Sequence, residues 1–205
     1  MMKLPINWPI NFQYSPISVS VDVSIVLMRR LLSLAKAEDK EKISPWIEQE
    51  CVHPDIRIEK ITCNLTYKGP RPHPLADSEI FPGHVQHGVF ALRKIPKGTQ
   101  LGEYVGEIAF DTKSLTPTER FKGVHRWEVQ FGGLALYISS AHIANELAFV
   151  NDYHGLQPQP NVRPTWIEHR GQGYLGYETL RDIEPLEEIL TDYGDPRADY
   201  LLKDR

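Results

Sequence analysis

Residues whose side chains could do chemistry are concentrated between Asn145 and Asn161. A short apolar run, Leu147 to Val150, ends at Asn151 and Asp152, and an aromatic residue, an imidazole, a glycine and two prolines follow. Apolar residues of this kind favour a buried element, and the polar residues then force the chain out of it. The segment therefore brings an amide and a carboxylate to one point. The alternative is a polar turn or helix end, since Asn and Asp are ordinary residues there.

Metal ligation is a second chemistry to consider, because the chain has eight histidines. His84 and His87, or Asp152 and His154, could each supply two ligands. No spacing matches a helix-borne zinc pair such as H-E-x-x-H. The two cysteines stand alone, which excludes a zinc module built on cysteines. We therefore expect no metal.

Nucleophilic and phosphate-binding sites are also absent from the sequence pattern. Ser139-Ser140 lacks the glycines of a nucleophile elbow, and we expect neither cysteine to be a nucleophile that a histidine activates. Gly171-Gln-Gly-Tyr-Leu-Gly superficially resembles a phosphate-binding loop, but the pattern leads into a strand and not into a helix.

Two tyrosines occupy equivalent places in an internal similarity. Residues 88–106 and 176–194 each contain a strand, a Leu-Arg-x-Ile step, a proline-containing turn and a second strand that ends near Tyr104 or Tyr193. Pro96 and Pro185 suit early positions of a β-turn. We interpret the units as two similar small sheets, each presenting one tyrosine. The alternative is a coincidence of two hairpins.

Length and composition limit the kinds of protein that this chain can be. The 205 residues predict one domain with an extension, and the net charge of -4 gives no sign of direct nucleic-acid binding. The longest apolar run is too short to span a membrane, and the N-terminal residues do not form a cleaved signal peptide. Two unpaired cysteines favour a reducing compartment.

The elements that must position these residues begin with an N-terminal extension. Met1 to Val21 predicts an extended arm, and Asp22 to Asp39 predicts a helix with Leu27, Leu31 and Leu34 on one face. Ser44-Pro45 predicts the start of a shorter helix that runs to Cys51. This pair of helices could dock on its own core, or the longer helix could form the seam of a homodimer.

The rest of the chain is predicted to be mainly β. Ile56 to Tyr67 contains alternating runs that are typical of strands, Lys68 to Gly83 predicts a loop, and turns follow at close intervals.

Three segments, in this order, resemble the motifs of the SET domain, the fold of most protein lysine methyltransferases. Gly88-Val-Phe-Ala, Ile95-Pro-Lys-Gly-Thr and Glu103-Tyr-Val-Gly-Glu resemble its opening motif. Residues 145–161 resemble the family's G-N-x-A-R-F-I-N-H-S-x-x-P-N, with Asn145, Phe149, Val150, Asn151, Pro160 and Asn161 in place. Residues 180–183 and 187–194 resemble the closing G-E-E-L-T-x-D-Y-G motif. The match covers about residues 84–194.

The resemblance implies a SET-domain β-clip fold, mainly β, of several small sheets with a pseudoknot made by the last two motifs. We expect residues 1–55 to form the arm and helical extension and residues 56–205 to form the SET domain. The cofactor S-adenosylmethionine would lie on one side, and a target lysine would enter a narrow channel from the other.

The resemblance also implies roles for particular residues. Tyr193 corresponds to the catalytic tyrosine, and Tyr104 to a second tyrosine of the channel. Thr191 and Tyr153 would line the substrate channel. The residues that would bind the cofactor are Gln86, His87, Gly88, Asn151, Asp152 and, from the C-terminal end, Tyr200. Methyl transfer needs alignment and a dry channel more than acid or base groups.

The sequence departs from the family pattern in five places. Asp152 replaces a histidine and is tolerable, because the family's residue contacts the cofactor mainly through its backbone. Ala148 replaces an arginine, and Leu186 replaces a glycine. Gln86 replaces the first glycine of the cofactor loop, which could narrow the approach of the cofactor and weaken its binding. Thr191 replaces a Phe or Tyr that limits the number of methyl groups, so we predict that more than one can be added.

The expected function is methylation of lysines on basic proteins such as histones or histone-like proteins. An acidic closing region would attract basic tails by charge; it comprises Asp182, Glu184, Glu187, Glu188, Asp192, Asp195 and Asp199. The alternative is a SET-derived module that binds a peptide or protein partner without transferring a methyl group. With its unrelated N-terminal helices, this chain resembles the small stand-alone SET proteins of intracellular bacteria. We therefore expect a cytoplasmic protein, or one that is secreted into a host cell and acts in its nucleus.

Overall fold

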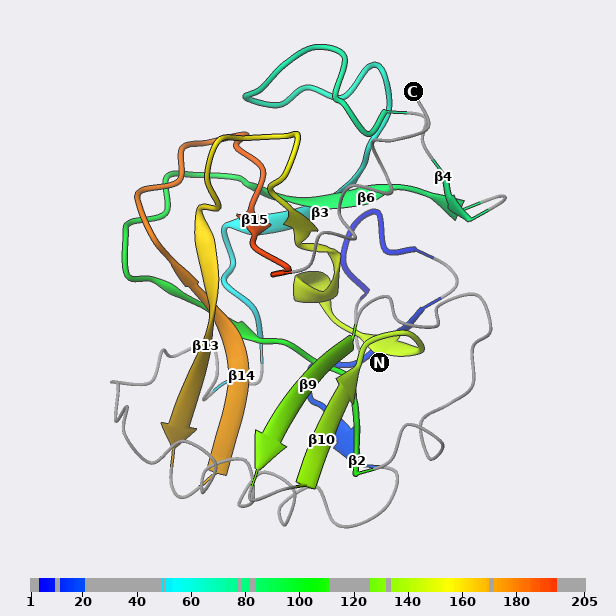
Figure 1. Cartoon of the computed structure of the whole chain (residues 1–205). Coiled ribbons are helices and arrows are strands. Elements are labelled where there is room, and N and C mark those ends of the chain that lie inside the picture. Colours follow the sequence, from blue (N-terminus) through cyan, green and yellow to red (C-terminus); the bar gives the residue numbers. More distant parts are fainter. Residues whose placement is uncertain are drawn as a thin grey trace.

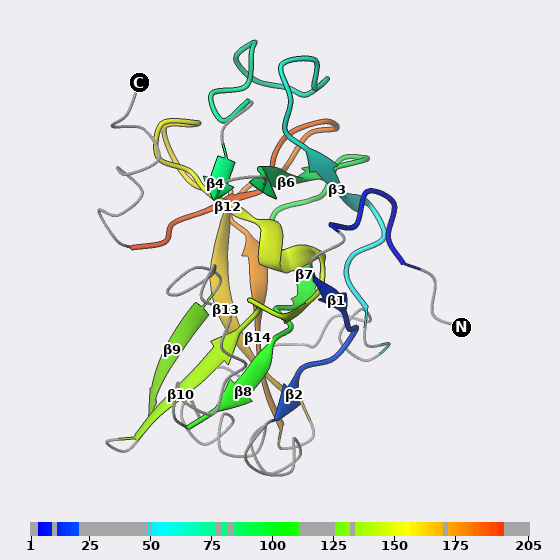
Figure 2. The ribbon, with the colours of Figure 1, turned by 90° about the vertical axis from the view of Figure 1, so that its right-hand side faces the viewer.

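The computed structural model describes residues 4–9, 12–20, 49, 51–76, 79–81, 84–110, 126–131, 134–169 and 172–194. Within these ranges the chain is mainly β, as expected, and small sheets surround a short 3-10 helix, η2 (Glu146–Phe149) (Figures 1 and 2). The helices predicted at residues 22–39 and 44–51 fall outside the described ranges except for Gln49 and Cys51, neither of which is helical. None of the helices in the described ranges has the length and apolar character needed to cross a membrane.

Two larger sheets form the lower half of the molecule as Figure 1 presents it. A three-stranded sheet has the order β13-β14-β7, with β13 at Val162–His169, β14 at Gln172–Thr179 and β7 at Gln100–Glu103. A four-stranded sheet has the order β2-β8-β10-β9, with β2 at Val19–Ser20, β8 at Glu107–Ala109, β10 at Leu134–Ser139 and β9 at Arg126–Phe131.

Two-stranded sheets lie above η2 in the same view. Strand β3 (Ile56–Lys60) pairs antiparallel with β6 (His87–Ala91). Strand β4 (Glu79–Phe81) pairs antiparallel with β5 (His84–Val85). The prediction of a loop from Lys68 to Gly83 is therefore wrong at β4. Ile80 and Phe81 are strand-forming residues. The strand is only three residues long and lies in a segment rich in Pro and Gly, so the sequence pattern predicted a loop.

The predicted extended arm is confirmed for its described part, and it packs on the rest of the chain. Strand β1 (Gln13–Tyr14) pairs parallel with β11 (Ile143–Ala144), and β2 pairs parallel with β8. The rings of Trp8 and Phe12 contact the ring of Phe149 edge-on, with centroids 5.6 and 4.9 Å apart. The arm thus adds strands and aromatic rings to the sheets that hold η2.

The two similar units do not form two separate sheets, so that interpretation was wrong. The strands of one unit, β6 and β7, lie in different sheets, and so do those of the other. The units instead meet each other at their Leu-Arg-x-Ile steps. The backbones of Ile95 and Ile183 exchange two hydrogen bonds of 2.9 and 2.8 Å, and both side chains are fully buried. The backbone N–H and C=O groups at these two steps satisfy each other, and burial of the two isoleucine side chains favours the pairing.

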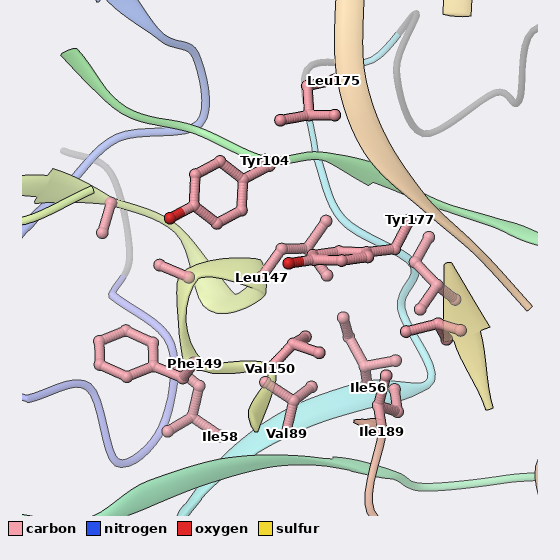
Figure 3. Close-up of a cluster of buried hydrophobic side chains, with 14 of the residues drawn as sticks. Ile56, Ile58, Val89, Tyr104, Leu147, Phe149, Val150, Leu175, Tyr177 and Ile189 are labelled. Carbon is pink, nitrogen blue, oxygen red and sulfur yellow. The ribbon is translucent and has the colours of Figure 1, made fainter. Parts of the chain in front are cut away.

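The apolar run before Asn151 lies in the core, as predicted. Asn145 caps η2, because its Oδ1 accepts a hydrogen bond from the backbone N–H of Leu147 at 3.2 Å. Leu147, Phe149 and Val150 then pack among Ile58, Val89 and Leu175 from other elements (Figure 3). A single turn of helix therefore carries the chain through the core to the polar residues that follow.

The chain leaves the core as strand β12 (Asn151–Asp152), which pairs parallel with β15 (Leu190–Thr191). This pairing packs the second and third motifs together, as the resemblance implies. Asn161 secures it, because its Nδ2 donates to the carbonyl of Glu188 at 2.7 Å and its Oδ1 accepts from the N–H of Leu190 at 2.7 Å. Asn161 is fully buried, so both hydrogen bonds are shielded from water.

Candidate active site

Asn151 lies at the centre of a buried hydrogen-bond network. Its Nδ2 donates to the backbone carbonyl of His87 and to Glu188 Oε1, each at 2.9 Å. Its Oδ1 accepts a hydrogen bond from Gln86 Nε2 at 3.0 Å. The structure therefore brings Gln86, His87 and Asn151 together, although 65 residues separate Gln86 from Asn151.

Gly88 is required by the close approach of this network to the backbone of β6. A Cβ atom at Gly88 would lie 2.6 Å from Glu188 Oε1 and 3.3 Å from Asn151 Nδ2. Both distances are below ordinary van der Waals contact. Because Asn151 and Glu188 are held by several hydrogen bonds, neither side chain can yield cheaply, and only glycine fits.

His73 and Glu188 are members of the network that the sequence did not indicate as site residues. His73 Nε2 lies 2.7 Å from Glu188 Oε2, and both side chains are almost fully buried. The ring of Tyr67 packs on His73, with centroids 4.7 Å apart. His73 comes from the segment predicted as a loop. The proline- and glycine-rich pattern around His73 carries no signal for a contact 115 residues away.

A cavity of about 320 Å³ borders this part of the network. Its wall includes Tyr67, His73, Leu156, Arg181 and Glu188. The Arg181 guanidinium forms an ion pair with the Glu187 carboxylate, which also lines the cavity. Arg181 and Glu187 are therefore already paired with each other, and Asn151 is not among the residues that line the cavity.

Asp152 connects β12 to the segment that carries Tyr193. Its Oδ2 accepts a hydrogen bond from the backbone N–H of Tyr193 at 2.8 Å. Its Oδ1 accepts from the backbone N–H of His154 at 2.8 Å and lies 2.5 Å from His154 Nδ1. Tyr153 is half-buried, stacks on His154 and donates its backbone N–H to the carbonyl of Thr191 at 2.9 Å. Asp152 thus holds the backbone of His154 and that of Tyr193.

The hydroxyl of Tyr193 is turned into the protein. It donates a hydrogen bond to the carbonyl of Val150 at 2.7 Å, although 47% of the residue is exposed. Burial of this end raises the pKa of Tyr193 well above its usual range, and Tyr104, Asp152 and Glu188 raise it further. The phenol therefore stays protonated at neutral pH and acts as a hydrogen-bond donor.

Tyr104 is fully buried, and Tyr177, which the sequence did not single out, lies beside it (Figure 3). Their ring centroids are 6.2 Å apart in an edge-on contact, and the ring of Trp127 contacts both. Burial raises the pKa of Tyr104, partly offset by its hydrogen bond with Ser140. Burial also raises the pKa of Tyr177, with further contributions from Tyr193 and Tyr104. Three tyrosines thus gather as neutral phenols on one side of Val150.

Thr191 is fully buried, and its hydroxyl oxygen has no hydrogen-bond partner among the described residues. It lies in β15 directly opposite Asp152. A polar atom in such a place is unfavourable unless a further group reaches it. The structure therefore places a small side chain with an open hydroxyl next to the segment of Tyr193.

Asp152, His154 and Asp192 form the one group in the described part of the chain whose ligand atoms could surround a metal ion, all within 4.8 Å of one another. Their oxygens already have protein partners, since Asp152 accepts from Tyr193 and His154, and Asp192 accepts from Gly194. Hydrogen bonding within the protein accounts for these three side chains.

The acidic closing region, which was expected to attract basic tails, is only partly exposed. Glu187 and Glu188 are buried and bonded to Arg181 and His73 respectively. Asp182 and Glu184 lie 2.7 and 3.8 Å from Lys94 Nζ. Asp195, Asp199 and the predicted cofactor residue Tyr200 lie outside the described residues. Of the described acids in this region, Asp192 is the one that remains exposed next to Tyr193.

Comparison with known proteins gives a family. A model of the SET domain matches residues 86–194. A curated relative from Arabidopsis thaliana, "Probable inactive histone-lysine N-methyltransferase SUVR1", is 31% identical over 118 residues, which make up 52% of this chain and 16% of the relative. The chain thus spans about one sixth of the length of that relative.

A solved structure of ATXR5 agrees in fold. A complex of ATXR5 with a mono-methylated histone H3.1 superposes with a TM-score of 0.59 at 14% identity, covering 90% of this chain and 81% of ATXR5. The Chaetomium thermophilum complex ctPRC2, in an autoinhibited conformation bound to S-adenosylmethionine, gives a TM-score of 0.43 at 21% identity, over 58% of this chain and 15% of that one. The family model covers more than half of the 205 residues. This chain therefore belongs to the SET-domain family and is related to histone-lysine methyltransferases.

Proposed function

We propose that this chain is an S-adenosylmethionine-dependent protein lysine N-methyltransferase. The observation that carries the proposal is the position of Tyr193, whose hydroxyl bonds to the carbonyl of Val150 while the next residue, Asn151, lies in the buried polar network. One short segment thus links a neutral phenol to a site for a polar ligand. The family's catalytic tyrosine and cofactor asparagine correspond to these same two residues.

The residues around Asn151 fit the polar end of the cofactor. The network contains the carboxylate of Glu188 and a buried amide oxygen, Gln86 Oε1, that has no partner among the described residues. Such a cluster suits a positively charged N–H donor. The bound cofactor would supply a methyl group on a positively charged sulfur, from which a nucleophilic amine can take it in line.

The chain's own contribution would be alignment and exclusion of water. The Tyr193 hydroxyl, fixed on Val150, would orient the lysine amine, and the buried Tyr104 and Tyr177 rings would keep water away. Because burial raises the pKa of all three phenols, none is a phenolate at neutral pH. The amine must therefore lose its proton to solvent before transfer, which burial of the amine favours.

Basic proteins are the substrate class that the site suits best. The carboxylates of Asp152 and Asp192 lie close together beside Tyr193 and would attract the positive charges that flank a target lysine. The fold is shared with ATXR5, whose structure contains histone H3.1. Histone or histone-like tails are therefore the first substrates to test.

The alternative is a SET-derived module that binds a peptide without methyl transfer. The hydrogen bond from Gln86 to Asn151 favours it, because Gln86 already uses the Asn151 oxygen. The name of the Arabidopsis relative, which marks that protein as inactive, points the same way.

Calorimetric titration with S-adenosylmethionine separates the two functions. We expect binding by the wild type that is lost in Asn151→Ala. We further expect Tyr193→Phe to bind the cofactor as the wild type does but to transfer methyl groups to histones roughly 100-fold more slowly, in line with the loss of one positioned donor. Tyr137→Phe, in the interior strand β10 of the four-stranded sheet, is the matched control. A folded wild type that gives no heat with the cofactor would support the binding module.

A further inference from the structure

A series of hydrogen bonds links the backbone of Leu75 to the side chain of Gln86. In each of them only one partner can be the donor. The N–H of Leu75 donates to His73 Nδ1 at 3.0 Å, so that nitrogen carries no proton. The proton of the neutral ring is then on Nε2, which donates to Glu188 Oε2 at 2.7 Å. His73 is therefore uncharged in this arrangement.

Glu188 determines the orientation of the Asn151 amide, because it accepts hydrogen bonds from both His73 and Asn151. Both carboxylate oxygens accept hydrogen bonds, Oε2 from His73 and Oε1 from Asn151, which is the behaviour of an ionised carboxylate. The second N–H of the Asn151 amide donates to the carbonyl of His87. Since both of these neighbours can only accept, the Asn151 amide cannot be turned round, and its oxygen must face Gln86.

Gln86 is the last residue of this series of hydrogen bonds, and its Oε1 remains without a donor among the described residues. Its Nε2 must donate to the Asn151 oxygen, so its Oε1 points elsewhere. Gln86 is 4% exposed, and Oε1 is buried without a hydrogen-bond partner among the described residues. A buried acceptor of this kind is unfavourable until a donor reaches it.

The charge of the network determines which donor suits it. Glu188 brings one negative charge to a place where it is 1% exposed, and neutral His73 does not cancel that charge. A charge of this sign favours a cationic N–H donor over a neutral one. An ammonium group close to Gln86 Oε1 would satisfy the open acceptor and offset the buried charge together.

We propose that Gln86 is a cofactor-binding residue whose Oε1 accepts a hydrogen bond from the ammonium group of S-adenosylmethionine, and that His73 and Glu188 are positioning residues that fix its orientation. The inference rests on the proposed function. It reverses the expectation that Gln86, in place of a glycine, weakens cofactor binding. It also assigns a role to His73, which lies before the part of the chain that the SET model matches.

Gln86→Leu tests the first part, because leucine keeps the volume and removes the acceptor. The measurement is calorimetric titration with S-adenosylmethionine and with an analogue that lacks only the amino group. We expect affinity for the cofactor to fall roughly ten- to hundredfold, the size expected for a hydrogen bond to a charged group. Affinity for the analogue should not change. Gln159→Leu, at an exposed loop position, is the matched control.

Glu188→Gln and His73→Leu test the positioning role. An amide at position 188 can donate or accept, so one of the two groups that hold the Asn151 amide in its orientation is lost, and Asn151 and Gln86 can turn round more easily. We expect the ratio of affinities for cofactor and analogue to fall roughly tenfold in both variants. This ratio does not depend on how stably the variant folds. His73→Gln, which retains an N–H donor toward Glu188, should restore it.

Three results overturn the proposal, and they are distinguishable. Equal weakening of cofactor and analogue by Gln86→Leu, or no weakening, removes the contact with the ammonium while leaving the proposed function intact. An unchanged ratio in both Glu188→Gln and His73→Leu removes the positioning role. A folded wild type that binds neither ligand overturns the proposed function and this inference together.

Discussion

Thr191 shows how the chemistry of a single residue depends on what surrounds it. From its type alone it is a small residue where the family carries an aromatic ring. In the structure it is also fully buried with an unpaired hydroxyl, opposite Asp152 in the pairing of β12 with β15. Its small size leads to a prediction about the number of methyl groups added, and its unpaired hydroxyl leads to a prediction about the free energy of unfolding.

Thr191→Val should raise the free energy of unfolding by about 1 kcal/mol, because valine has the same shape and removes a buried hydroxyl that lacks a partner. Chemical denaturation of both proteins measures the difference. Thr179→Val is the matched control, since the Thr179 hydroxyl donates to the carbonyl of Pro96 at 2.7 Å and its loss should be destabilising. A less stable Thr191→Val protein would show that the hydroxyl has a partner.

The wild type should add more than one methyl group to a lysine, because a side chain as small as threonine at position 191 leaves room that an aromatic ring would fill. Mass spectrometry of a histone peptide at long reaction times measures the product. A reaction that stops at monomethyl-lysine would contradict this prediction.

At the scale of the element, η2 shows how one polar residue can determine the course of the chain. Asn145 does more than cap the helix. Its Nδ2 donates to the carbonyl of Glu103 at 2.7 Å, and its Oδ1 also lies 3.5 Å from the N–H of Val105. These contacts attach η2 to the strand end that carries Tyr104. The element therefore positions both Asn151 and Tyr104.

Asn145→Ala should lower the free energy of unfolding by about 2–4 kcal/mol, because it removes a cap and leaves a buried backbone carbonyl without its donor. Asn145→Asp keeps the acceptor for the cap and loses the donor to Glu103, so it should also be destabilising. Urea unfolding followed by tryptophan fluorescence measures both. An Asn145→Ala protein as stable as the wild type would mean that the strand end and η2 are held by other contacts.

At the scale of the whole molecule, stability should depend on the charge of Glu146. This carboxyl is 8% exposed, its Oε2 has no partner among the described residues, and burial raises its pKa above the usual 4.5. The folded protein therefore holds a proton that the unfolded chain has released. Stability falls as pH rises from about 4.5 to the raised pKa of the folded protein, and each pH unit between these two values costs about 1.4 kcal/mol.

Glu146→Gln should remove this decline, because glutamine keeps the size of the side chain and cannot ionise. Thermal unfolding of both proteins across pH 4 to 8 measures it, and the variant should be the more stable of the two near neutral pH. Glu178→Gln, whose half-buried carboxylate pairs with Arg163, is the control. Parallel pH profiles for the wild type and Glu146→Gln would show that Glu146 is ionised in the folded protein without cost.

The sequence by itself determined the features that depend on short segments. Asn151, Asp152 and Tyr193 could be predicted as candidate site residues because their motifs are local. The β-rich class followed from alternating runs and turn residues. The buried run before Asn151 was predicted from the apolar character of Leu147 to Val150.

Only the tertiary structure decided the features that join distant segments. The bonds of Gln86 to Asn151 and of His73 to Glu188, and the pairing of Ile95 with Ile183, depend on which backbone and side-chain groups are brought within about 3 Å. No local pattern encodes such a distance, because each partner looks like an ordinary loop or strand residue where it stands. Burial then turns these contacts into energy, since a polar group removed from water must find its partner inside the protein.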